Sequence, residues 1–310
     1  MGIFLVLIAS FFAASSNLAM RRSIDFGSTS RAFLMIQLSI AFVASIFMNP
    51  IRTQIFSWNY PIIYLGLFMG VVLGVMMYCL GKSFEKGPVG LSVSALNAST
   101  VVPGIVMAFL FGKALGYDYH IYHALGSLLV LIGLFWAGAN FDHLNNRKMW
   151  LFFISGAFLL HVFFLVGMQW RALMINAPEK ASFFRILTPS EATSQWFMPA
   201  VFFGASVLQI FLFFFHEKRK LKSIEWGYGI FGGLANCSST FFLIWATEVA
   251  TSVENAMIFP IFSVGIILLC NTWGRYLYQE QINWKASQLC ACGIFLGCVD
   301  WSKVVPLFGF

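Results

Sequence analysis

Four asparagines stand inside long apolar stretches of this chain: Asn17, Asn97, Asn236 and Asn271. An amide that is taken out of water costs free energy unless its donors and acceptors find partners. Because the four amides lie in four different stretches, we expect them to converge on one polar lining. Amides and hydroxyls without a dense cluster of charges suit a zwitterionic or a neutral polar solute. The chemistry that they predict is therefore the binding of a small molecule.

The apolar stretch around Asn97 also carries hydroxyl side chains, among them Ser99, and a proline, Pro103. At the depth of a bilayer such residues are tolerated where they face protein or a water-filled cavity. Pro103 has no N–H, so it frees a backbone carbonyl of the same helix. We therefore expect this stretch to line a cavity.

A second polar face is predicted in the stretch 226–245, where Gly232, Asn236, Ser239 and Thr240 share one side of a helix. The glycine would let another helix or a ligand approach the backbone closely. Two interpretations stay open, because this face either binds the solute or packs against a neighbouring helix through its hydroxyls. For His161, a histidine among leucines and phenylalanines in the stretch 150–170, the open alternatives are a hydrogen-bonded packing residue and a proton relay.

The candidate substrate-binding residues all carry a polar side chain inside an apolar stretch; they are Ser16, Asn17, Asn97, Ser99, His161, Asn236, Ser239, Ser263 and Asn271. Glu254 is the candidate for coupling to protons, because it flanks the stretch 255–278 and a carboxylate at membrane depth can carry a proton. The alternative for Glu254 is a solvated acid at a helix start, where the helix dipole favours negative charge.

The composition predicts a polytopic membrane protein. Of 310 residues, 59% are hydrophobic and 10% are charged, whereas soluble domains carry about 25% charged residues. A membrane-spanning helix needs about 20 apolar residues, so ten such stretches leave no room for a soluble domain. The ten stretches are residues 2–20, 32–48, 61–80, 89–111, 122–139, 150–170, 196–215, 226–245, 255–278 and 284–301. The net charge of +7 lies in the connections, where it indicates topology and lipid headgroup contacts rather than nucleic acid binding.

The second half of the chain resembles the first. With a shift of 167 residues, Gly126 superimposes on Gly293, and a polar break divides the chain into residues 1–148 and 149–310. Each half holds five apolar stretches, and an odd number makes the second half enter the membrane upside down. Inverted repeats are a recurring plan of secondary transporters, which bind substrate between the repeats. The expected fold is therefore all-α, with ten transmembrane helices in two inverted five-helix repeats.

Several positions are similar to the pattern of the drug/metabolite transporter superfamily: the run Ser15–Asn17, Arg31 at the start of the second stretch, and Gly126 and Gly293. The chain resembles the ten-helix, EamA-like branch of that superfamily, although Lys113 stands where the family usually has glutamate. The resemblance implies a permease with a central cavity lined by the first, third, fourth, sixth, eighth and ninth helices. Its expected substrate is a small polar organic metabolite, such as an amino acid or derivative or a nucleoside-like compound, moved by alternating access.

Charge predicts an orientation that differs from that of the family. Of the 19 Lys and Arg, 13 lie in the connections on one side of the predicted bundle, four of them in residues 216–222. The positive-inside rule places that side in the cytoplasm and both termini outside. The family resemblance implies both termini inside.

Signals for catalysis are weak in this sequence. No Gly-x-Ser-x-Gly elbow occurs, no histidine cluster predicts a metal site, and we expect no cofactor and no enzyme activity. An intramembrane enzyme that acts on lipid headgroups is the alternative function. We expect a monomeric, multi-pass protein of a bacterial cytoplasmic (inner) membrane. Its partners would be the small-molecule substrate, the lipid bilayer, and protons or a counter-substrate.

Overall fold

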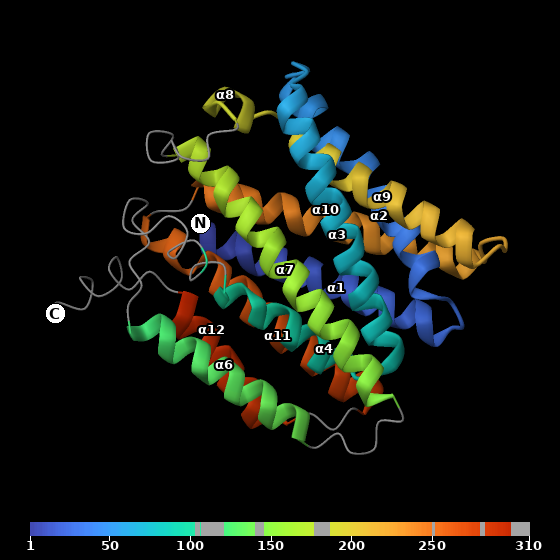
Figure 1. Ribbon diagram of the computed structural model, residues 1–310, viewed down its shortest axis with the longest axis vertical. Coiled ribbons are helices and arrows are strands. Elements are labelled where there is room, and N and C mark those ends of the chain that lie inside the picture. The colour runs from blue at the N-terminus through green and yellow to red at the C-terminus, as the bar shows by residue number, and fades with distance from the viewer. Residues whose placement is uncertain are drawn as a thin grey trace.

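The computed structural model describes residues 1–102, 106, 121–139, 146–176, 187–249, 252–279 and 283–298. Within these ranges the chain forms helices and short connections, and no strand is present. The helices pack side by side in one bundle (Figure 1). The all-α class is therefore confirmed for the described residues.

Helices make up most of the described part of the first half. They are α1 (Gly2–Asp25), α2 (Ser30–Ile46) with one π turn, η1 (Phe47–Ile51), α3 (Tyr60–Lys86), α4 (Val89–Ala98) with one 3-10 turn, η2 (Ser99–Val101), and α6 (Ile121–Ala139). The residues at two of the helix N-termini explain why these helices begin there. The Thr29 hydroxyl accepts a hydrogen bond from the Ala32 N–H and caps α2. Pro61 stands in the first turn of α3, where its missing N–H has no partner to lose.

The described part of the second half also consists mainly of long helices, and a helix of four residues lies between the first two of them. They are α7 (Arg147–Asn176), α8 (Pro189–Ala192), α9 (Phe197–His216), α10 (Ser223–Val249), α11 (Ser252–Tyr278) and α12 (Trp284–Cys298). The predicted stretch 89–111 extends beyond η2 into residues that lie outside the described part of the chain.

Among the described residues, five helical segments are long and apolar enough to cross a membrane by length and composition: Gly2–Asp25, Ser30–Ile51, Tyr60–Lys86, Arg147–Met168 and Phe197–His216. Their mean hydropathy lies between 1.9 and 2.3, and each contains or largely overlaps one of the predicted stretches. Segments of this kind are compatible with an integral membrane protein.

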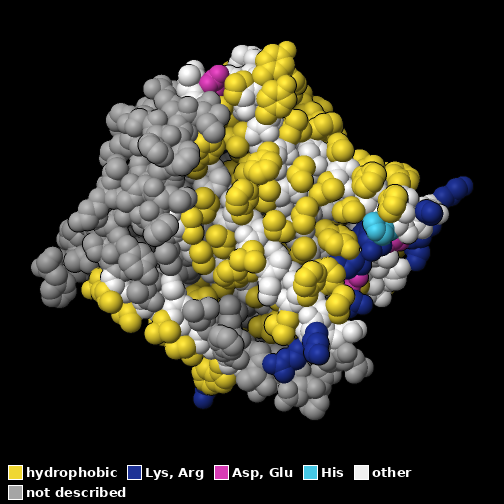
Figure 2. Space-filling model, viewed as in Figure 1, with side chains coloured by type: hydrophobic (Ala, Val, Ile, Leu, Met, Phe, Trp, Pro, Cys, Tyr) yellow, Lys and Arg dark blue, Asp and Glu magenta, His cyan; other side chains and the backbone are white. Residues whose placement is uncertain are grey.

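The outer face of the bundle is apolar. Figure 2 shows hydrophobic side chains over most of the described surface, with Lys and Arg toward the right-hand and lower edges of the view. Large side chains point outward, for example Phe68 at 56% exposure, Phe152 at 70% and Phe211 at 61%. Contiguous exposed apolar surface of this extent marks contact with a membrane or a partner.

Helices that are distant in the sequence lie side by side. α1 packs against α10 and α11, α2 packs against α9 and α10, and α3 packs against α7 and α9. α6 packs against α12, and α4 packs against α11. The two halves of the chain are therefore interleaved rather than placed as separate bundles.

Glycines allow the closest of these contacts. A Cβ atom added at Gly70 of α3 would lie 2.3 Å from the Val201 carbonyl oxygen of α9, and one added at Gly204 of α9 would lie 2.7 Å from the Leu67 carbonyl oxygen of α3. Such distances leave room for hydrogen but not for a side chain. The backbones of α3 and α9 therefore touch, as small residues permit in apolar surroundings.

An ionic network joins the turn between α1 and α2 to the connection between α9 and α10. Arg31 pairs with Glu217 at 3.3 Å, and Arg219 pairs with Glu225 at 2.6 Å. The Ser28 hydroxyl also donates to the fully buried Glu225 carboxylate at 3.0 Å. The hydrogen bonds with Glu225 hold the pKa of Arg219 above its usual value. Ser28, Arg31, Glu217, Arg219 and Glu225 form what we call the ionic network.

The contact of α3 with α9 makes Gly70→Ala destabilising, because the added Cβ must displace the Val201 carbonyl. Overpacking of this kind costs about 1–3 kcal/mol. Gly227→Ala in α10 is the matched control, since nothing lies within 4 Å of a Cβ added there and helix propensity favours alanine by up to about 1 kcal/mol. Thermal unfolding in detergent compares the variants. Equal midpoints for the two would contradict the close approach of α3 and α9.

Candidate functional site

The fourth predicted stretch breaks its α-helix inside an apolar region. α4 ends at Ala98 and continues as the 3-10 turn η2. The Ser99 hydroxyl donates to the Leu96 carbonyl oxygen at 2.6 Å, and the Thr100 hydroxyl donates to the Asn97 carbonyl oxygen at 2.7 Å. Hydroxyls bound to carbonyls of the preceding turn compete with the backbone ladder and loosen it.

Two other helices bring polar side chains to this break. His161 of α7 places Nδ1 2.6 Å from the Ser99 Oγ atom, and the Ser263 hydroxyl of α11 donates to the Thr100 Oγ1 atom at 3.4 Å. Asn97 is buried and donates to the Val93 carbonyl oxygen at 2.9 Å. The structure therefore brings together four of the predicted site residues. We call Asn97, Ser99, Thr100, His161 and Ser263 the helix-break cluster.

One placement of the ring proton of His161 satisfies all of the hydrogen bonds around it. Both the Ser99 Oγ atom and the His161 Nδ1 atom lie near the Leu96 carbonyl oxygen, at 2.6 Å and 3.1 Å. A carbonyl oxygen only accepts, so both contacts are satisfied when the Ser99 hydroxyl and the Nδ1–H group donate. The Nε2 atom is then the acceptor of the ring. In this arrangement His161 does not take the proton of Ser99, as a general base for a nucleophilic serine would.

Two other predicted residues bond helices to each other. Ser16 of α1 accepts a hydrogen bond from the Gln37 amide of α2 at 2.8 Å and donates to the Gly232 carbonyl oxygen of α10 at 3.1 Å. Ser239 of α10 donates to the Ala9 carbonyl oxygen of α1 at 2.8 Å. In this structure both hydroxyls hold α1 against α10, which is the packing role that the sequence left open.

Asn271 also bonds to a neighbouring helix, because its amide donates to the Ser287 hydroxyl of α12. Asn17 and Asn236 differ from it. Both are half-buried, and neither amide forms a hydrogen bond with another described residue. The amides of Asn17 and Asn236 therefore keep their hydrogen-bonding groups without a partner among the described residues. Glu254 lies in α11, but its side chain falls outside the described part of the chain.

The structure adds polar contacts that the sequence reasoning missed. The Gln209 amide of α9 is fully buried and donates to the Gly74 carbonyl oxygen of α3 at 2.7 Å. The hydroxyls of Ser39 in α2 and Ser206 in α9 lie 2.8 Å apart. Each of these polar side chains has an apolar residue on both sides in the sequence, which was the available signal. Both contacts join helices rather than reach the helix-break cluster.

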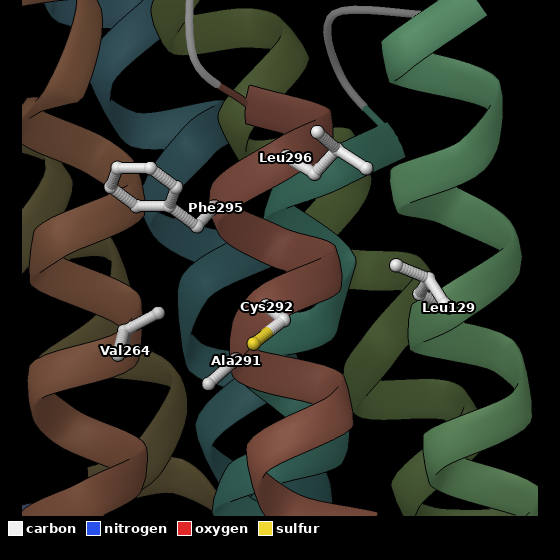
Figure 3. A pocket seen from close by; sticks show the side chains of 6 residues that line it. All are labelled: Leu129, Val264, Ala291, Cys292, Phe295 and Leu296. Atoms are coloured by element: carbon white, nitrogen blue, oxygen red, sulfur yellow. The ribbon is translucent and has the colours of Figure 1, made fainter.

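A cavity of about 400 Å³ lies between α6, α11 and α12 (Figure 3). Its lining is apolar and consists of Leu129, Val264, Ala291, Cys292, Phe295 and Leu296. None of these side chains can orient a polar solute, and none is a predicted site residue. Among the described residues, no group of three or more His, Cys, Asp or Glu side chains could hold a metal ion.

Comparison with known proteins gives the fold and nothing more. No family model matches the chain. No curated protein matches it either. A solved structure described only as "Crystal structure of protein" is similar to 97% of this chain and 96% of that chain, with a TM-score of 0.59 and 13% identity. At this identity the similarity concerns the arrangement of the helices.

The proton placement at the helix-break cluster predicts an unreactive serine. A fluorophosphonate probe, which labels activated serines, should not label the purified protein, because Ser99 donates its proton to the Leu96 carbonyl oxygen. Mass spectrometry of the treated protein measures labelling, and Ser99→Ala is the control. Labelling that disappears in Ser99→Ala would reverse the assignment and favour an intramembrane enzyme.

Proposed function

We propose that the chain is a secondary active transporter, a permease that moves a small polar organic metabolite across a membrane by alternating access. The observation that carries this proposal is the helix-break cluster. Secondary transporters bind their substrates near the bilayer midplane, where helices depart from regular α-helical geometry and polar groups line the site; the 3-10 turn η2 is such a departure. An amino acid or derivative, or a nucleoside-like compound, fits a site of hydroxyls, amides and one imidazole.

Residue contacts support the inverted repeat on which this mechanism depends. A Cβ atom added at Gly126 would lie 2.6 Å from the Gly293 carbonyl oxygen, and one added at Gly293 would lie 2.7 Å from the Gly126 carbonyl oxygen. Ser39 and Ser206 form a hydrogen bond and are also 167 residues apart. In a two-fold arrangement, residues near the axis meet their own equivalents. Two such pairs with the same sequence offset support the proposed pseudo-two-fold axis.

The helix pairings repeat in the same way. If α1, α2, α3, α4 and α6 correspond to α7, α9, α10, α11 and α12, then the pair α1–α10 corresponds to α7–α3. Likewise α2–α10 corresponds to α9–α3, and α1–α11 corresponds to α7–α4. All six pairs are in contact. This reciprocity supports ten spans in two repeats, 1–148 and 149–310, that cross the membrane in opposite directions.

The helix-break cluster lies across the boundary of these repeats. Asn97, Ser99 and Thr100 belong to the first repeat, whereas His161 and Ser263 belong to the second. A movement of one repeat against the other would therefore change the distances within the site. A substrate that binds one arrangement more tightly shifts the balance between outward-open and inward-open states.

The resemblance to the EamA-like branch of the drug/metabolite transporter superfamily is part of this proposal. The proposal also includes a monomer in the lipid bilayer of a bacterial inner membrane, with protons or a counter-substrate as the driving partner. Counterflow into proteoliposomes, screened with radiolabelled amino acids and nucleosides, tests the function. Accumulation of one class, abolished by unlabelled compound, is the expected result. If no metabolite exchanges and none raises the unfolding temperature, the proposal is wrong.

Asn236→Ala should weaken transport without loss of folded protein, because its half-buried amide has no partner among the described residues. A tenfold loss of apparent affinity corresponds to about 1.4 kcal/mol. Asn271→Ala is the matched control, since that amide is buried and bonded to Ser287. It should lower the unfolding temperature instead. Normal transport by folded Asn236→Ala protein would remove Asn236 from the site.

Glu254→Gln should abolish accumulation driven by a pH gradient but leave substrate exchange intact, because an amide cannot carry the coupled proton. Uptake and exchange in the same proteoliposomes separate the two steps. Glu191→Gln on α8 is the control, since this exposed carboxylate lies in a four-residue helix outside the five long apolar segments. Accumulation that persists in Glu254→Gln would assign coupling to another group.

A further inference from the structure

Arg171 is a cation without a counter-charge among the described residues. It lies near the end of α7, three residues beyond the apolar segment Arg147–Met168. Its guanidinium group stacks over the Phe197 ring, 4.2 Å from the ring centre. The Nε atom is buried and has no hydrogen-bond partner. Burial lowers the pKa of Arg171 to about 10, so the side chain remains charged at neutral pH.

The residue before Phe197 in the sequence carries a second buried donor without a partner. Trp196 directly precedes Phe197, and its indole Nε1 atom is buried with no hydrogen-bond partner. The Trp196 ring packs against Trp58, with ring centres 5.1 Å apart. The Arg171 guanidinium and the Trp196 indole therefore each have a buried N–H without an acceptor, and each side chain packs against an aromatic ring.

Such an arrangement is incomplete without an acceptor. A buried charge is strongly unfavourable unless it is paired, and an aromatic ring offsets only part of the cost. A buried N–H without an acceptor is unfavourable as well. An oxyanion with several oxygens accepts hydrogen bonds from donors of both kinds. Phosphate and carboxylate are the groups that the planar guanidinium fork binds best.

The position in the bundle favours phosphate. α8 contacts both α3 and α7 near this end (Figure 1), and the neighbouring Trp58 and Tyr60 are 57% and 64% exposed. Exposed Trp and Tyr side chains at helix ends mark the level of lipid headgroups. At that level, the common anion is the phosphate group of a lipid.

We propose that Arg171 and the Trp196 indole N–H bind a phosphate group at this end of the bundle, either in an anionic lipid headgroup or as free phosphate. The site lies outside the helix-break cluster, and its existence does not depend on transport. Absence of phosphate binding would therefore leave the proposed transport function intact, and absence of transport would leave the proposed phosphate site intact.

Thermal unfolding of the purified full chain in a neutral detergent tests the proposal in two arms. One arm titrates inorganic phosphate, and the other adds phosphatidylglycerol, with phosphatidylcholine as the zwitterionic reference. Stabilisation by inorganic phosphate identifies a site for the free anion. Stabilisation by phosphatidylglycerol alone identifies a headgroup site. If neither anion stabilises the wild-type protein, the proposal is wrong.

Variants of Arg171 and Trp196 test whether the anion stabilises the protein by binding at these two residues. Arg171→Gln should raise the half-saturating concentration of the stabilising anion about tenfold or more, since glutamine lacks both the positive charge and the planar guanidinium donors. Trp196→Phe should weaken binding by a smaller factor, because the ring remains and only the N–H is removed. Arg52→Gln is the matched control: Arg52 also lies over an aromatic ring, at 5.3 Å from the centre of Phe241, but its Nε donates to the Met48 carbonyl oxygen.

The response of Arg52→Gln should equal that of the wild type. If Arg171→Gln does not fold, Arg171→Lys replaces it, and this variant should retain part of the response because it keeps the charge. Wild-type responses from Trp196→Phe and from either Arg171 variant would overturn the assignment.

Discussion

Close approach of helix backbones is the constraint on which this structure depends. In apolar surroundings water does not drive helices together, so association requires dense van der Waals contact. Gly70 and Gly204 allow it between α3 and α9, and Gly126 and Gly293 allow it between α6 and α12. These contacts fix the helix pair α3–α9 and the helix pair α6–α12. The helices between them, α4, α7 and α11, are then held where their polar side chains meet.

Buried polar groups are the second constraint, and they separate structural from functional residues. Ser94 donates to the Gly90 carbonyl oxygen of its own helix, and Ser239 donates to the Ala9 carbonyl oxygen of another. A hydroxyl satisfied in this way costs little and has no need of a ligand. The informative groups are those that remain without a partner, which among the described residues include the amide of Asn236 and the Nε atom of Arg171. The proposed phosphate site and the predicted effect of Asn236→Ala rest on that difference.

The sequence predicts helices better than contacts, for a physical reason. Apolar runs that end at charges locate α1, α3 and α9, although α1 continues five residues past the predicted end at residue 20, where Arg21 and Asp25 pair across one turn. The meeting of Ser99 with His161 follows from how α4 and α7 cross, which no local pattern encodes. Ser239 was equally plausible as lining, but its partner is a backbone carbonyl, and a carbonyl leaves no signature in the sequence.

The two ends of the bundle differ in what opening would require. The five ion pairs that described residues form with one another all involve the ends of α1, α2 and α3 or the α9–α10 connection. Opening this end would separate the α1–α2 turn and the start of α2 from that connection, which would break the Arg31–Glu217 pair and the hydrogen bond from Ser28 to the fully buried Glu225 carboxylate. Removing partners from a buried charge is costly because the charge stays desolvated. If the chain works by alternating access, the structure therefore corresponds to the state closed at this end. Substrate binding at the helix-break cluster must then supply the free energy that separates the ionic network.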